Sequence, residues 1–511
     1  MPTPTRQRAG TRQWVGLSVV ALPTALLGLD VTVMYLALPE LSLDLRPSSV
    51  EALWIMDAYG FMIAGWLITM GTLGDRIGRR RLLMIGAAAF GVASIAAAFS
   101  TSAAMLIAAR AALGVAGATL MPSTLALISN MFTDARQRAF AIGVWATMFA
   151  LGMAVGPLVG GALLERFWWG SAFLVAIPIV LIVVVAAPLL LPEYRDPDSG
   201  RLDLASVVLS LSAILPVIYA IKHGAVEGLD APTLTAAVVG VLFAVLFVRR
   251  QNHLTDPLLD LRLFATPTFS AALAILLVGL VGVGGAMFLV TQHLQLVEQL
   301  SPLHAGLWMG PPALMMFVAA IGAPLLARRI RPGRIVAGTL ALSAVGYALL
   351  AAVDGPGSIA LVVIGFGLGY LGLGAIAALG TDLVVGSAPP NKAGSASALS
   401  ETVQELGLAI GVAVLGSLAN AIYRAEMTTT APHPATAPYT QSLSDAVSAG
   451  ELPGSLLDAA RQAQTTGLNA TAFVTAATIL VLAVLSAVML RAVPTIGGND
   501  EAADPADLPA P

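Results

Sequence analysis

The chain has 511 residues, of which 57% are hydrophobic and 11% are charged, and its formal net charge is −3. Soluble domains carry about 25% charged residues, so this composition excludes a chain that folds mainly in water. The small net charge provides no basic field for nucleic acid, and the absence of cysteine excludes disulfides, thiolate nucleophiles and cysteine metal sites.

Apolar stretches that are long enough to cross a bilayer recur along almost the whole chain. A helix needs about 20 apolar residues to cross the hydrocarbon layer, and within it satisfies its own backbone hydrogen bonds. About fourteen stretches meet this requirement. They lie near 14–38, 52–73, 82–99, 104–131, 139–164, 168–191, 204–223, 232–249, 268–291, 303–327, 335–353, 358–385, 393–423 and 470–491. We interpret the first as an uncleaved helix because it is too long for a signal peptide.

Positive charges predict the orientation of these spans. Most lysines and arginines fall before the first span and in every second loop after it, and loops of this kind face the cytoplasm. We therefore expect both termini to lie in the cytoplasm, with the spans in the inner membrane of a bacterium. An even number of spans is then required.

A weak internal repeat predicts how the chain is divided. The loop at 71–80 has a fainter counterpart at 322–334, as two related halves of a transporter would produce. We expect an all-α integral membrane protein with two six-helix bundles, residues 1–200 and 263–495. Residues 201–262 form a two-helix insert, 424–469 a polar external loop with helical potential, and 496–511 a disordered cytoplasmic tail.

Five motifs follow one another along the first half of the chain. They are LDVTVMYLALP at 29–39, LWIMDAY at 53–59, the glycine- and arginine-rich loop at 71–81, Arg110 with Gly114, and GMAVGPLVGG at 152–161. In this order they resemble the fourteen-helix drug:proton antiporter branch of the major facilitator superfamily, most closely the QacA-like pumps. The resemblance implies the major facilitator fold and proton-coupled efflux of lipophilic cations, such as quaternary ammonium compounds, dyes and fluoroquinolones. Two positions depart from the QacA-like pattern, namely Met316 in place of a carboxylate and Ala176 in place of an asparagine.

Ionisable side chains inside spans are costly to insert and therefore mark candidate functional sites. Asp30 and Arg110 lie at similar depths in spans one and four, so we expect them to pair. The pair either binds a cation or proton or only joins the helices. Glu401 and Glu405 share one face of span thirteen. Because two close carboxylates repel each other in a low dielectric, we expect at least one to hold a proton in some states; otherwise they line a wet cavity or hydrogen-bond to neighbouring helices.

Two further carboxylates lie nearer the ends of spans. Asp57 is close to the external end of span two, and Asp382 is close to the cytoplasmic end of span twelve. Each either takes part in coupling or is solvated at a helix end or in a vestibule.

Three sets of residues are candidates for gating or for lining a cavity. By resemblance, the loop motif gates the cytoplasmic opening, although topology alone also explains its arginines; its members are Gly71, Asp75, Arg76, Gly78, Arg79 and Arg80. A stripe of small residues in span five permits close helix packing, either as structure or as a hinge; it comprises Gly152, Gly156, Pro157, Gly160 and Gly161. Aromatic rings either face a bound cation or anchor the helices in the membrane; they are Trp54, Tyr59, Trp145, Phe149, Phe366 and Tyr370.

Other chemistry has no support in the sequence. The five histidines are scattered without metal-ligand spacing, and no P-loop Gly-Lys-Ser/Thr follows a glycine-rich stretch, so ATP is not the expected fuel. We expect no cofactor, no metal and no enzymatic activity, and a monomer whose partners are lipophilic cations, protons and membrane lipids. The alternatives are an exporter or flippase of lipids or other amphiphilic envelope molecules, a non-transporting receptor or scaffold, and, less favoured, a nutrient symporter.

Overall fold

The computed structural model is built of helices throughout the residues that it describes. These are 9–132, 134–195, 203–254, 257, 261–387, 393–430, 438–448, 453–491 and 493–495. Fourteen helical segments within them are long and apolar enough to cross a membrane. The prediction of an all-α membrane protein with fourteen spans is confirmed. The predicted tail at 496–511 lies outside the described residues.

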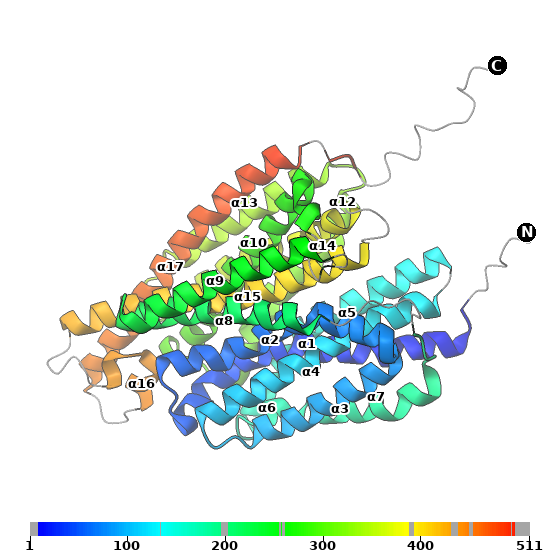
Figure 1. Ribbon diagram of the computed structural model, residues 1–511. Coiled ribbons are helices and arrows are strands. Elements are labelled where there is room, and N and C mark those ends of the chain that lie inside the picture. The colour runs from blue at the N-terminus through cyan, green and yellow to red at the C-terminus, as the bar shows by residue number, and fades with distance from the viewer. Residues whose placement is uncertain are drawn as a thin grey trace, which may run out of the picture.

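The first six spans make up the N-half. They are α1 (Thr11–Leu45), α2 (Ser49–Ile77), α3 (Arg79–Ala98), α4 (Ala103–Met131), α5 (Ala135–Leu164) and a sixth span divided into α6 (Ser171–Leu174) and α7 (Ala176–Leu190). α1 packs on α5, α2 packs on α4, and α3 packs on α4 and α7 (Figure 1).

The last six spans make up the C-half. They are α10 (Pro267–Gln292) with the π-turn η2 (His293–Val297), α11 (Pro302–Trp308) with α12 (Gly310–Leu326), α13 (Pro332–Leu350), α14 (Ile359–Gly386), α15 (Ala393–Thr430) and α17 (Gly454–Met489). The short helices η1 (Leu261–Ala265), η4 (Pro438–Thr440) and α16 (Leu443–Ser448) lie between them. α15 and α17 run well past the predicted spans, because their outer turns bury Tyr423, Met427 and Ala463 in a cluster with α16.

Polar caps set where several spans begin. Ser48 accepts a hydrogen bond from the backbone of Glu51, whose carboxylate accepts one in return, so the two form a capping box at the start of α2. Ser102, Asp203 and Asp230 accept comparable bonds at the starts of α4, α8 and α9.

The two halves meet at one end of the bundle. We call the end at which α1 begins and α17 finishes the proximal end, and the opposite end the distal end. In Figure 1 the halves lie close together distally and spread apart towards the termini. At the distal end, a Cβ atom on Gly161 of α5 would lie 2.5 Å from the carbonyl oxygen of Pro302, and one on Gly306 of α11 would lie 2.2 Å from that of Pro157. Only glycine permits these contacts between the halves.

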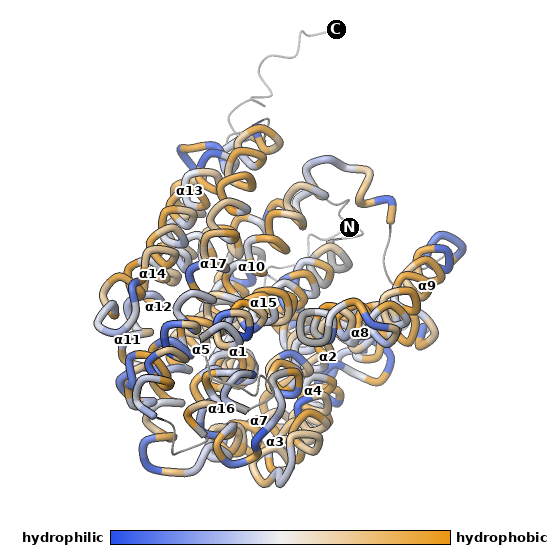
Figure 2. The backbone as a smooth tube through the Cα atoms, turned by 90° about the vertical axis from the view of Figure 1, so that its left-hand side faces the viewer, coloured by the Kyte–Doolittle hydropathy of each residue, from blue (hydrophilic) through white to orange (hydrophobic). Residues whose placement is uncertain are grey.

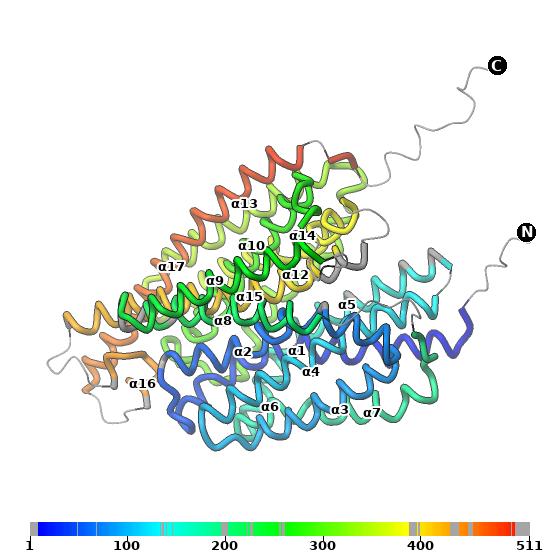
Figure 3. Tube along the Cα trace, in the orientation of Figure 1, coloured from blue at the N-terminus to red at the C-terminus, as the bar shows by residue number. Residues whose placement is uncertain are grey.

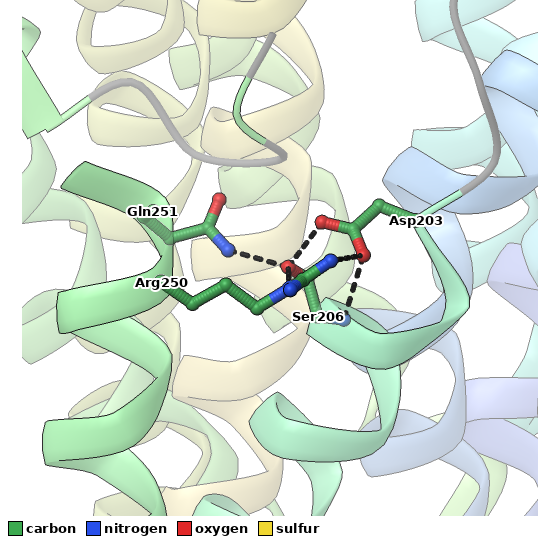
Figure 4. Close-up of polar contacts among 4 residues, drawn as sticks. All are labelled: Asp203, Ser206, Arg250 and Gln251. Carbon is green, nitrogen blue, oxygen red and sulfur yellow. Dashed lines mark hydrogen bonds and ion pairs between the residues drawn. The ribbon is translucent and has the colours of Figure 1, made fainter. Parts of the chain in front are cut away.

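A helical hairpin, α8 (Leu204–Glu227) and α9 (Ala231–His253), connects the halves. Figure 4 shows the polar cluster that joins its proximal ends. Arg250 Nη2 donates to Asp203 Oδ1 at 2.8 Å, Gln251 Nε2 donates to Ser206 Oγ at 2.6 Å, and Ser206 Oγ donates to Asp203. Burial opposes ionisation, but the hydrogen bonds from Arg250 and Ser206 outweigh it and hold the pKa of Asp203 below its ordinary value. The cluster therefore ties the two helices into one unit.

Candidate functional site

A buried ion pair joins three helices of the N-half. Arg110 Nη1 of α4 donates to Asp30 Oδ2 of α1 at 2.7 Å, and the two side chains are only 2% and 9% exposed. Arg110 Nε also donates to the carbonyl oxygen of Ile55 in α2 at 3.1 Å. Its guanidinium carbon lies 4.6 Å from the centre of the Tyr59 ring. The predicted pairing of Asp30 with Arg110 is confirmed, and Arg110 has partners on both neighbouring helices.

A glycine sets the approach of α4 to α2 at this point. A Cβ atom on Gly114 would lie 2.4 Å from the carbonyl oxygen of Tyr59, so only glycine lets the two backbones come this close. Gly114 is one turn from Arg110 on α4. The close approach therefore brings the guanidinium within reach of Ile55 and of the Tyr59 ring.

A small cavity beside the ion pair is shared by the two halves. Its volume is about 30 Å³, which is room for about two water molecules. The polar residues that line it are Tyr35 of α1, Asp57 and Tyr59 of α2, Arg110 of α4 and Glu405 of α15. Asp57 is 1% exposed and Glu405 is 6% exposed. A drug-sized ligand needs about 300–1,000 Å³, so this cavity is too small to hold one.

The four carboxylate candidates outside the ion pair lie in different surroundings. Asp57 and Glu405 face the same cavity from opposite halves. Glu401 lies one turn nearer the proximal end of α15; it is half-buried and is not part of the cavity lining. Asp382 is exposed near the proximal end of α14. The structure thus brings Glu405 and Asp57, which belong to different halves, to one cavity.

Tyr35 was not singled out by sequence reasoning, although it lines the cavity. It is buried on α1, five residues after Asp30 and inside the motif at 29–39. Its position inside that motif was the sequence feature that could have identified it as a site residue. Tyr35 adds a hydroxyl group to a cavity whose other polar lining residues are Asp57, Tyr59, Arg110 and Glu405.

The stripe of small residues on α5 lies against α1. A Cβ atom on Gly152 would lie 2.1 Å from the carbonyl oxygen of Ala25, and one on Gly156 would lie 1.9 Å from Thr32 Oγ1. Gly160 faces Val33 in the same way, at 3.0 Å. The predicted close helix packing is confirmed. Gly161 and Pro157 extend the stripe to the distal contact with the C-half.

The loop motif between α2 and α3 is held by the segment that follows α7. Gly78 has a φ of 113°, and a Cβ atom there would lie 2.4 Å from Glu193 Oε1. The backbone N–H of Arg80 donates to Glu193 Oε1 at 3.1 Å, and Arg80 Nη1 donates to the carbonyl oxygen of Leu191 at 3.0 Å. Glu193 lies more than a hundred residues after the motif. The only indication of it in the sequence is its position as an acidic residue just past span six.

The remaining motif residues stay close to α2 and α4. Asp75 near the end of α2 and Arg79 at the start of α3 form an ion pair, and Arg79 Nη1 donates to the carbonyl oxygen of Pro122 in α4. Gly71 faces Pro122 as well, and Arg76 is exposed. The hydrogen bonds and the ion pair described here for Asp75, Arg79 and Arg80 lie within the N-half, and the predicted gating role of the motif stays a prediction.

Replacing Glu193 by glutamine is expected to lower the free energy of unfolding by about 1 kcal/mol, because charge-assisted hydrogen bonds become neutral ones. Thermal unfolding of the purified protein in detergent measures the change. Arg81→Gln is the matched control: its side chain faces the same carboxylate at 3.8 Å but is 62% exposed, and exposed pairs contribute little. Equal unfolding temperatures for Glu193→Gln and the native protein would contradict the assignment of Glu193 as the anchor of this loop.

The aromatic candidates are dispersed. Tyr59 is the one that lines the cavity. Trp54 lies edge-on to Phe61 of α2, and Trp145 Nε1 donates to Thr124 Oγ1 at 2.9 Å. The other three lie elsewhere: Phe149 is half-buried at the contact of α5 with α1, and Phe366 and Tyr370 pack together within the C-half. Among the described residues there is no group of three or more histidine, aspartate or glutamate side chains placed to hold a metal ion.

Comparisons with known proteins give a consistent result. The model of the Major Facilitator Superfamily matches residues 20–412. The chain is 43% identical over 496 residues to the multidrug efflux pump LfrA of Mycolicibacterium smegmatis, covering 96% of this chain and 98% of that one. It is 36% identical over 424 residues to the methyl viologen resistance protein SmvA of Salmonella typhimurium, covering 81% of this chain and 84% of that one.

A solved structure shares the fold. It is a bacterial homolog of the human lysosomal transporter Spinster in an inward-facing, unoccupied conformation. It superposes with a TM-score of 0.64 over 94% of this chain and 98% of that chain, at 17% sequence identity.

Proposed function

The chain belongs to the Major Facilitator Superfamily, and from that premise we propose that it exports lipophilic cations in exchange for protons by alternating access. Drug efflux follows from its likeness to multidrug efflux pumps. Beyond drug efflux, the proposal specifies that the substrate is a cation and that the coupling ion is the proton. It requires no ATP or other cofactor, and no chemical change in the substrate.

The observation that carries the proposal is the cavity that Asp57 of the N-half and Glu405 of the C-half both line, beside Arg110. Asp30, which is bonded to Arg110, brings to three the number of largely buried carboxylates around this centre. Fully ionised, this group of residues would carry excess negative charge in a low dielectric, which is costly. A proton or an organic cation compensates the excess, and a site that accepts either one in turn is the requirement for exchange.

The energetics favour protons as the driving ion. Moving one positive charge outward against an inside-negative potential costs about 2.3 kcal/mol per 100 mV, and inward proton flow supplies that free energy. With the termini in the cytoplasm, the closed distal contacts face the exterior and the cavity is loaded from the cytoplasm. Protonation from outside then lowers the negative charge and releases the cation, and the protonated carrier returns.

The substrate class follows from the cavity and from the relatives. The cavity adds the aromatic faces of Tyr35 and Tyr59 to its carboxylates, and aromatic rings attract cations. One relative is named for resistance to methyl viologen, which is an organic dication. We therefore include singly and doubly charged cations among the substrates, in the inner membrane of a bacterium.

Transport by the purified protein in proteoliposomes tests the proposal. An imposed pH gradient and an internal pH dye report proton movement on addition of ethidium, methyl viologen, a zwitterionic drug or a fluorescent phospholipid. We expect proton movement that depends on the two cations and stops when the gradient is collapsed. Transport of the phospholipid without proton movement would instead identify an amphiphile exporter, and no transport of any compound would favour a receptor or scaffold.

A further inference from the structure

The α8–α9 hairpin contributes one helix to the body of the protein and exposes the other. Among the described residues, α9 packs extensively only on α8, whereas α8 also packs on α2 and α15. The outer face of α9 is apolar and exposed, through Leu234, Val238, Val241 and Leu242. Figure 2 shows α9 at the edge of the bundle, with α8 between it and α2, and Figure 3 shows α8 lying along α15. α9 thus returns the chain across the membrane, and α8 is the helix that meets the junction of the two halves.

That junction is built from very small residues. A Cβ atom on Gly60 of α2 would lie 3.2 Å from the Cβ atom of Ala409 on α15. One turn along α15, Ala413 is fully buried in the same cluster. Small residues let the two helices approach and slide over each other, but they also leave little side-chain volume between the inside of the protein and its surroundings.

The same small residues border the central cavity. Gly60 and Ala409 line the space that holds Asp57 and Glu405. Ala409 therefore belongs both to the lining of this cavity and to the apolar cluster on the outer side of the α2–α15 junction.

α8 adds large apolar side chains on the outer side of these small residues. Ile214, Leu215 and Ile218 pack in one apolar cluster with Phe61 of α2 and with Ala409 and Ala413 of α15. One turn nearer the proximal end, a Cβ atom on Gly65 of α2 would lie 2.4 Å from Leu211. The polar cluster of Asp203 and Arg250 ties α8 to α9 at the proximal end, and His223 Nε2 lies 3.1 Å from Asp230 Oδ2 near the distal turn.

We propose that α8 is the outer wall of the central cavity, and that Leu215 and Ile218 seal the α2–α15 junction against water and lipid. Asp57 and Glu405 are then reached only through the alternating openings of the two halves. The consequence for protons depends on the proposed function, because a leaking wall would let protons bypass exchange. The seal itself is a property of packing and is tested separately.

The natural absence of cysteine allows a direct test. Ala409→Cys introduces a single thiol into a chain that has none. Its position on α15 faces Gly60 of α2, which has no side chain. The rate of its labelling by N-ethylmaleimide in membranes is compared between native α8 and the variant Leu215→Ala/Ile218→Ala. We call Leu215→Ala/Ile218→Ala the thinned variant. We expect its labelling to be about tenfold faster or more than with native α8, since a local packing defect raises access to a buried group.

The matched control removes similar side-chain volume from the lipid side of the hairpin. Val238→Ala/Leu242→Ala lies on the exposed face of α9, and it should leave the labelling rate at the native level. Equal labelling of the thinned variant and this control would overturn the proposal. If the double variant unfolds at a lower temperature than the control, the single variants Leu215→Ala and Ile218→Ala decide the question with the same readout.

A second measurement links the seal to protons. In proteoliposomes without substrate, the thinned variant should dissipate an imposed pH gradient several-fold faster than the native protein, and adding Glu405→Gln should remove that leak. A leak that persists with Glu405→Gln would place the defect away from the cavity and contradict the proposal. If the native protein moves no protons with any substrate, the proposed function fails, whereas thiol labelling still decides whether α8 is the wall.

Discussion

Replacing Glu405 by glutamine is expected to lower proton-driven efflux of ethidium by about two orders of magnitude or more, the scale typical of losing a proton-transferring side chain. Glutamine keeps the size of the side chain and most of its hydrogen-bonding capacity, but it cannot exchange a proton. Glu405 is buried and lines the same cavity as Asp57 of the other half. Proteoliposomes with an imposed pH gradient measure both ethidium efflux and the accompanying proton movement.

Glu401→Gln is the matched control on the same helix. Glu401 is one turn nearer the proximal end, half-buried and outside the cavity lining, so we expect this variant to retain substrate-dependent proton movement. The assignment fails if Glu405→Gln transports at the native rate. If only Glu401→Gln abolishes transport, the proton carrier is Glu401 and the cavity serves the substrate.

Replacing Arg110 by methionine is expected to lower the free energy of unfolding by about 3–5 kcal/mol, because it leaves a buried carboxylate without its counter-ion. Arg110 is 2% exposed and bonded to Asp30 at 2.7 Å, and it also donates to the carbonyl oxygen of Ile55. Methionine keeps much of the apolar stem but supplies no charge or donor. Thermal unfolding in detergent, together with the yield of folded protein from membranes, measures the loss.

The neutral pair Asp30→Asn/Arg110→Gln separates structure from function. It removes both charges, so it should recover much of the stability lost in Arg110→Met, since neither partner is left as a buried, uncompensated charge. Transport should remain lost, because the site can no longer balance a proton against a cation. Normal efflux by the neutral pair would show that the ion pair only joins α1 to α4. Native stability of Arg110→Met would contradict the energetic assignment.

The spans could be predicted from the sequence because each depends on its own composition. A helix in lipid satisfies its backbone internally, so a run of about 20 apolar residues is sufficient to identify it. The positions of α2, α4 and α10 follow the predicted stretches closely. For 424–469 the sequence indicated an external loop with helical potential, but not how far α15 and α17 extend into it, because the cluster with α16 stabilises their outer turns.

The sequence by itself determined which side chains were candidates, whereas the tertiary structure decided which of them meet. Burying a charge is costly wherever it occurs, so Asp30, Arg110 and Glu405 stood out in apolar surroundings. Helical periodicity groups residues on one helix only, and it joined Glu405 to Glu401. Packing between helices depends on close contacts such as Gly60 with Ala409 and Gly114 with Tyr59. These contacts bring Glu405 and Asp57 to one cavity, and α8 packs on the outer side of the α2–α15 contact.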